Sequence, residues 1–244
     1  MIFYYSGTGN SLYAAKKLID DNEKLINIAE ALEKKEFTYE LQDNEKVGFV
    51  FPVYFYIVND IVSEFIRNLK IKHTSYVYAV ITCGASISGA GRQLKNLSSE
   101  RKIHLSNVYT LVMPDNAMIY YNIAPEEENK KKLQTSDRQI VKIKKAILQE
   151  KTGKISKSIL TPVLLGVYHR VKGTKKFSVT DACVGCGLCE KNCQEHVIEM
   201  INHKPVWKKE KCSKCTACIN KCPKHAIQYG RGTKKRNHYY NPYV

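Results

Sequence analysis

Eight of the nine cysteines lie between Cys183 and Cys222, in two runs of identical spacing, C-x2-C-x2-C-x3-C. Thiolates at two-residue intervals can converge on three corners of an iron–sulfur cubane, and this spacing is typical of [4Fe–4S] ligands. Zinc is the alternative, but zinc sites usually use separated C-x2-C pairs. The spacing therefore predicts two [4Fe–4S] clusters. The ligands are Cys183, Cys186, Cys189 and Cys193 in the first run, and Cys212, Cys215, Cys218 and Cys222 in the second.

The two runs are an internal duplication, because residues 181–200 and 210–229 align without a gap. In chains of this spacing the fourth cysteine of each run ligates the other cluster. We therefore expect one cluster on Cys183, Cys186, Cys189 and Cys222, and the other on Cys212, Cys215, Cys218 and Cys193. The region resembles bacterial two-cluster ferredoxins over about 50 residues, except that Gln194 follows Cys193 where Pro223 follows Cys222.

A glycine-rich loop near the start of the chain could bind a phosphate. It joins the apolar run 2–5 to a segment in which apolar residues recur at helical spacing. The amino end of that helix offers free N–H groups and a positive dipole to an anion. The loop has no lysine and no triphosphate-binding motif, which favours a phosphate monoester over a nucleoside triphosphate. The alternative is an ordinary turn capped by Asn10. The candidate residues are Ser6, Gly7, Thr8, Gly9, Asn10 and Ser11.

This loop resembles the FMN phosphate loop of flavodoxins, and the resemblance implies two further flavin-binding loops at the carboxyl ends of strands. Tyr54, Phe55 or Tyr56 could stack on the isoalloxazine ring, although at least one of them is expected to be a packing residue. Cys83 is expected to lie near the flavin without acting as a nucleophile. The implied residues are Pro52, Val53, Tyr54 and Phe55 in one loop, and Thr82, Cys83, Gly84 and Gly89 in the other.

The intervening sequence alternates between strand-like and helix-like segments, which predicts a parallel sheet. Strands are expected at 2–5, 25–29, 47–51, 76–82 and 108–113, with Pro52 ending the third. The predicted fold is α/β, a flavodoxin-like doubly wound five-stranded parallel sheet followed by a small α+β bacterial two-cluster ferredoxin domain. The expected divisions are a flavodoxin-like FMN-binding domain at 1–150, a basic linker with a docking element at 151–177, the ferredoxin domain at 178–232 and a basic tail at 233–244.

The net charge of +16 comes from the second half of the chain. Residues 1–125 carry 13 basic and 13 acidic residues, whereas residues 126–244 carry 26 and 10. Anionic clusters and the FMN phosphate would compensate part of this excess. The remainder predicts an acidic redox partner protein, with nucleic acid the weaker option. No signal peptide or membrane-spanning run is evident, so we expect a cytoplasmic protein.

Taken whole, the chain resembles the flavodoxin-plus-ferredoxin fusion proteins of anaerobic bacteria and archaea, the EFR-type ferredoxin family. The resemblance implies an intracellular electron-transfer protein that passes electrons between two [4Fe–4S] clusters and FMN. The alternative is an FMN-dependent reductase of a small-molecule acceptor such as a quinone, a nitro compound or oxygen. The absence of glycine from Pro52–Val58 favours the reductase, whereas the absence of an evident acid–base pair disfavours it. No catalytic residue is predicted.

Overall fold

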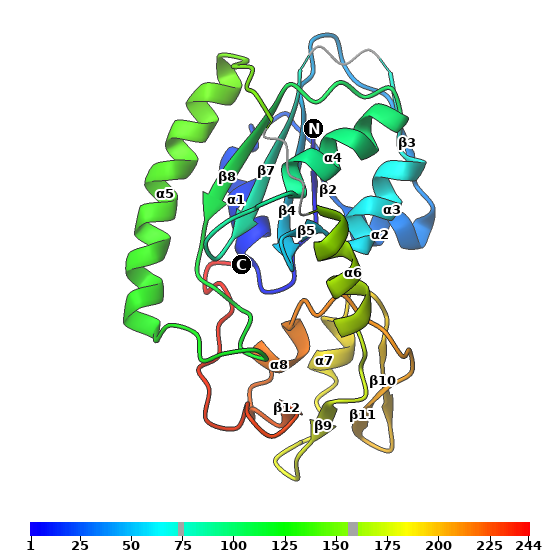
Figure 1. The fold of residues 1–244 in the computed structure, drawn as a ribbon, viewed down its shortest axis with the longest axis vertical. Helices are drawn as coiled ribbons and strands as arrows, with labels where there is room; N and C mark the ends of the chain where they lie inside the picture. The colour runs from blue at the N-terminus through cyan, green and yellow to red at the C-terminus, as the bar shows by residue number, and fades with distance from the viewer. Residues whose placement is uncertain (73–75, 156–160) are drawn as a thin grey trace.

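The computed structural model describes residues 1–72, 76–155 and 161–244. Its centre is a parallel sheet with the strand order β2-β1-β4-β7-β8 (Figure 1). This is the order of flavodoxin-like doubly wound sheets, so the predicted fold class is confirmed. The strands are β1 (Ile2–Tyr4), β2 (Leu25–Asn27), β4 (Val47–Tyr54), β7 (Val77–Cys83) and β8 (Asn107–Val112).

Helices cover both faces of the sheet because its central strands are apolar on both sides. One core lies between the sheet and α1 and α5, and the other lies between the sheet and α2, α3 and α4. The helices are α1 (Asn10–Leu18), α2 (Ile28–Lys34), α3 (Asp60–Asn68), α4 (Ala90–Glu100) and α5 (Glu126–Leu148). A separate pair of short strands, β3 (Thr38–Tyr39) and β6 (Lys70–Ile71), lies outside this sheet.

The third strand of the sheet does not end at Pro52, contrary to the sequence-based prediction. β4 continues to Tyr54 and turns back through Phe55 and Tyr56 into the antiparallel β5 (Ile57–Val58). β1 pairs with β4 only as far as Val50, so Pro52 lies where the strand has lost one of its neighbours and can be tolerated. The strand therefore extends to the edge of the pocket described below.

The cysteine-rich part of the chain contains two short helices and two pairs of short strands, with the strands at the base of the molecule (Figure 1). The helices α7 (Leu188–Lys191) and α8 (Ala217–Asn220) occupy equivalent positions in the two cysteine runs. The strands are β10 (Ile198–Ile201) paired with β11 (Lys204–Trp207), and β9 (Phe177–Val179) paired with β12 (Ile227–Tyr229). Outside these strands, Gly173 and Lys211 form a single β-bridge.

The two parts share a hydrophobic cluster. Met118, Ile119 and Ile123, from the segment between β8 and α5, pack against Ile219 and Ile227 of the cysteine-rich part. The helix α6 (Thr161–Val171) adds a fully buried tyrosine, Tyr168, to the core of the sheet. The segment after β12 then runs back towards the carboxyl ends of the strands (Figure 1). Within the described ranges, no helix has the length and apolar character needed to cross a membrane.

Candidate functional site

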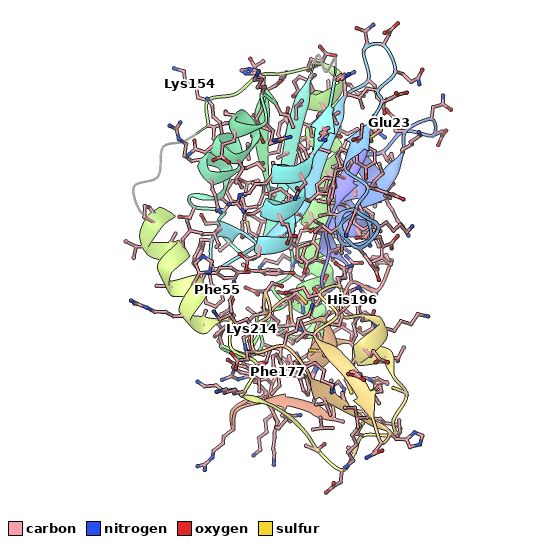
Figure 2. The ribbon with its side chains drawn as sticks, turned by 90° about the vertical axis from the view of Figure 1, so that its right-hand side faces the viewer. Glu23, Phe55, Lys154, Phe177, His196 and Lys214 are labelled. Carbon is pink, nitrogen blue, oxygen red and sulfur yellow. The ribbon has the colours of Figure 1, made fainter. Side chains whose placement is uncertain are left out.

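A cavity of about 310 Å³ opens at the carboxyl ends of β1, β4, β7 and β8. Twelve of the fourteen residues predicted to bind the flavin line it, and the other two, Gly9 and Gly89, do not. Phe55 and Lys214, two of its lining residues, lie near the junction of the two parts of the molecule (Figure 2). The lining residues that were predicted are Ser6, Gly7, Thr8, Asn10, Ser11, Pro52, Val53, Tyr54, Phe55, Thr82, Cys83 and Gly84.

The glycine-rich loop has the features of an anion cradle. It leads into α1, whose first residue is Asn10, and Gly9 before it adopts a left-handed conformation with φ of 99°. The buried Ser6 Oγ has no hydrogen-bond partner among the described residues. A buried hydroxyl without a partner is costly, and a phosphate oxygen at this helix terminus would satisfy it. The residues present therefore fit the phosphate group of a mononucleotide.

Asn116 connects this loop to the cysteine-rich part. Its Nδ2 donates to Thr8 Oγ1 at 2.8 Å and to the carbonyl oxygen of Cys215 at 3.3 Å. Since Thr8 Oγ1 accepts this bond, the Thr8 hydroxyl hydrogen is left to donate elsewhere. The carbonyl of Asn116 accepts from Thr216 Oγ1 at 2.9 Å and from Asn220 Nδ2 at 3.1 Å. One residue thus fixes both the phosphate loop and the second cysteine run.

The segment 239–241 closes a ring of hydrogen bonds around the loop. Asn220 Oδ1 accepts from the backbone N–H of Tyr239, whose hydroxyl donates to Asn10 Oδ1 at 2.7 Å. The backbone N–H of Asn241 donates to the carbonyl of Thr8, also at 2.7 Å. All of these residues except Asn10 are buried, so the bonds are shielded from water. The tail, for which the sequence indicated no structural role, therefore positions the phosphate loop.

Gly7 is the point of closest approach between the loop and the cysteine run. A Cβ atom at this position would lie 2.9 Å from both Cβ and the carbonyl oxygen of Cys215, and 2.8 Å from the Tyr54 hydroxyl. These separations leave no room for a side chain, which explains the glycine. A predicted cluster ligand thus contacts the predicted phosphate loop directly.

A third loop, following β8, was not anticipated from the sequence. Asp115, Asn116, Tyr120 and Tyr121 line the cavity, and the Tyr121 hydroxyl donates to Asp115. The signal was available: a fifth strand was predicted, and ligands in this fold bind beyond the carboxyl ends of strands. Lys214 also lines the cavity, but it comes from the second cysteine run, so only the folded chain reveals it.

The aromatic residues of the β4–β5 turn have different environments. Tyr54 is buried in the core, as expected for at least one of the three, whereas Tyr56 is exposed. Phe55 packs edge-on against Tyr120, with ring centroids 5.2 Å apart. Phe55 and Tyr56 both have positive φ, 54° and 63°, in the positions that glycine or asparagine usually fills in a two-residue hairpin. The strain of this turn is held at the edge of the cavity.

Cys83 lies on the cavity wall as a buried thiol. Burial raises the pKa of Cys83 to about 11. A thiol is protonated below its pKa, so Cys83 remains a thiol at pH 8. We expect iodoacetamide at pH 8 to leave Cys83 unlabelled in the anaerobic holoprotein, as measured by mass spectrometry. Glutathione added to the same sample is the control thiol and should react fully. Rapid labelling would contradict this inert role.

Three cysteines of the first run lie beside the fourth cysteine of the second run. Cys183, Cys186 and Cys189 surround a small cavity together with Cys222 of the other run. Cys193 does not line that cavity; it lies near the second run, where it contributes to raising the pKa of Cys212, Cys215 and Cys218 after burial. The two fourth cysteines have equivalent surroundings, since Sγ of each accepts a backbone N–H at 3.3 Å, from Val197 and Ala226.

Residues 182–227 match the family model described as a 4Fe-4S dicluster domain. The segment is an iron–sulfur domain. It is also similar to one component of the ion-translocating oxidoreductase complex of Methanosarcina acetivorans, with 39% identity over 46 residues. This alignment covers 19% of the present chain and 17% of that relative, so the chain spans less than a fifth of its length.

Three solved structures that resemble the chain cover between 46% and 62% of it. A putative flavoprotein from Bacteroides uniformis has 18% identity and a TM-score of 0.36, covering 46% of this chain and 88% of that one. The Trp repressor binding protein from Bacillus subtilis has 12% identity and a TM-score of 0.37, with coverages of 62% and 99%. An FMN-dependent NADH-azoreductase from Bacillus anthracis has 9% identity and a TM-score of 0.35, with coverages of 60% and 98%.

Proposed function

We propose that this chain is an electron-transfer flavoprotein that binds one FMN in the 310 Å³ cavity and two [4Fe–4S] clusters on its eight clustered cysteines. The observation that carries the proposal is the contact between Gly7 and Cys215. It brings a phosphate loop and a cluster-ligating run into one site. We would not expect the two sites to lie so close together if the two cofactors worked separately.

The geometry supports an order for the three redox centres. Lys214 of the run Cys212–Cys218 lines the FMN cavity, and Cys215 lies against Gly7 in the cavity wall, so the cluster of this run would be proximal to the flavin. The first run lies farther out, and its Cys186 is exposed. Single electrons would pass between the distal cluster, the proximal cluster and FMN, and the flavin would supply two-electron capacity.

The chain's own residues bind and orient these groups. Ser6, Thr8 and the first N–H groups of α1 would hold the phosphate, with Asn116 orienting the Thr8 hydroxyl as a donor. Phe55 and the tyrosines of the β8 loop would enclose the ring system. The hydrogen bonds made by Asn116, Asn220 and Asn241 would keep the proximal cluster at a fixed position against the flavin.

A dedicated reductase is less well supported by the cavity. Among the described residues that line the cavity, Tyr121 and Asp115 form the one hydrogen-bonded pair of titratable side chains. Burial and the neighbouring Asp115 raise the pKa of Tyr121, so it would donate a proton poorly at neutral pH. The electron-carrier function needs no such donor.

Anaerobic purification followed by elemental and flavin analysis tests the proposal. We expect about eight irons, eight sulfides and one FMN per chain, because each complete run of this spacing corresponds to one [4Fe–4S] cluster. Two zinc ions without sulfide would contradict the cluster assignment. Eight irons without flavin would support the two clusters and contradict the proposed FMN.

A further inference from the structure

We propose that a basic face on the cysteine-rich part is the docking surface for a small acidic electron-transfer protein, which exchanges single electrons with the proximal cluster. The inference rests on the proposed function, since it names the partner of that electron-transfer chain. The face consists of eight exposed side chains: Lys175, Lys176, Lys208, Lys209, Lys211, Arg231, Lys234 and Lys235.

Backbone pairing brings these residues together from three segments. Thr174 N–H donates to the carbonyl of Glu210 at 2.8 Å, and Gly173 forms a β-bridge with Lys211. Gly230 N–H donates to the carbonyl of Lys176 at 2.8 Å, which joins the segment 231–236 to the same region. Glu210 is the one acidic residue in the ranges 172–176, 208–211 and 231–236. Figure 2 shows nitrogen-tipped side chains projecting from this end of the molecule, below Phe177.

The face also has an apolar centre. A groove of about 470 Å³ runs between Lys175 and Lys208, and the rings of Phe177 and Trp207 in it are stacked with centroids 5.0 Å apart. A charged rim around partly exposed aromatic rings is the usual composition of a protein–protein interface.

The basic face is connected to the proximal cluster ligands. Cys212 N–H donates to the carbonyl of Lys172 at 3.0 Å. Lys214 Nζ lies 4.6 Å from the centroid of Phe177 and 4.0 Å from that of Tyr229, while Lys214 also lines the flavin cavity. The run Cys212–Cys218 therefore lies between the face and the flavin. One electron would leave the partner's reduced centre and arrive at this cluster, without a bond change or a proton transfer.

The composition of the face favours an acidic protein over nucleic acid. Seven of its eight charges are lysines, whereas planar guanidinium groups are the preferred partners of phosphates. Lysines on a solvated rim raise the rate of encounter through long-range attraction, which suits a short-lived electron-transfer complex. Lys208 forms an ion pair with Glu199 and Lys209 donates to the carbonyl of Glu195, whereas the other six side chains make no hydrogen bond or ion pair with described residues. The face therefore keeps most of its charge available to a partner.

Charge reversal at the face tests the proposal against a matched control. The face variant is Lys175→Glu/Lys234→Glu, and the control is Lys131→Glu/Lys142→Glu on the exposed side of α5. Within the described part of the chain, none of these four side chains makes a hydrogen bond or an ion pair, so both variants change the net charge equally without removing a contact. Both are prepared as full-length holoproteins, and cofactor content is checked first.

The readout is anaerobic stopped-flow reduction by a reduced, acidic two-[4Fe–4S] ferredoxin. We expect its second-order rate constant at low ionic strength to fall about 10-fold in the face variant and less than about 2-fold in the control. The difference should disappear near 1 M salt, where the Debye length is about 3 Å. Equal rate constants for the two variants would overturn the docking surface.

Two further measurements separate the possible failures. A neutral reductant, the photogenerated 5-deazariboflavin radical, should reduce wild type and both variants at the same rate. If it reduces the clusters of wild type but never the flavin, the proposed function itself fails. If the face variant loses only salt-dependent binding to random duplex DNA and keeps its rate with ferredoxin, the face is a nucleic-acid surface and the proposal is overturned.

Discussion

Replacing Gly7 by alanine is expected to weaken FMN binding by roughly 10- to 100-fold and to change the EPR signal of the proximal cluster in the same protein. The added Cβ would lie 2.9 Å from the backbone carbonyl of Cys215, which cannot move aside as a flexible side chain would. Overpacking of this kind costs about 1–3 kcal/mol, and the expected change in Kd corresponds to about 1.4–2.7 kcal/mol within that range. Fluorescence titration with FMN and EPR of the reduced protein measure the two effects.

Gly166→Ala is the matched control, because nothing lies within 4 Å of a Cβ atom at that position in α6. It should leave both the FMN affinity and the EPR signal at wild-type values. If Gly7→Ala changed FMN binding but left the EPR signal unchanged, the loop and the cysteine run would be independent of each other. If Gly7→Ala left FMN binding unchanged, the phosphate loop would not be part of the flavin site.

Removing Cys193 is expected to destroy the cluster served by Cys212, and removing Cys222 the cluster served by Cys183. Each Cys→Ala variant should retain about four irons per chain, because one complete cubane remains. The physical reason is the arrangement of the ligands: Cys222 borders the cavity lined by Cys183. Iron analysis and EPR of the four single variants should sort them into these two pairs.

The flavin supplies an independent readout of the same pairing. Only the second run borders the FMN cavity, so Cys193→Ala and Cys212→Ala should slow flavin reduction by the remaining cluster. Cys183→Ala and Cys222→Ala should leave the proximal cluster and its transfer to flavin intact. If Cys193→Ala behaved like Cys183→Ala in both measurements, each run would hold its own cluster.

The sequence carried the information for each cofactor site but not for the relation between them. Cysteine spacing and the strand–loop–helix pattern are local properties, so the cysteine-run boundaries and most of the phosphate loop could be predicted. The contact of Gly7 with Cys215 spans more than 200 residues and depends on how two folded parts pack. Nothing in local spacing indicates such a contact, and a two-domain interpretation suggests independent sites.

The turn at Phe55 and Tyr56 shows a second limit. Local preference argues against two aromatic residues with positive φ, because the Cβ atom crowds the backbone there. Packing of Phe55 between Tyr120 and Tyr168 outweighs this preference in the folded chain. Tertiary packing likewise extends β4 past Pro52, where local propensity alone predicts that the strand ends.

The bonds from Tyr239 and Asn241 to Asn10 and Thr8 also govern the order in which the molecule can be assembled. The phosphate loop is synthesised before these partners, which lie more than 200 residues later in the chain. A nascent chain therefore exposes an incomplete nucleotide site until the cysteine runs and the residues after them have folded. An FMN bound at this loop would then be held fully only once the segment 239–241 is in place.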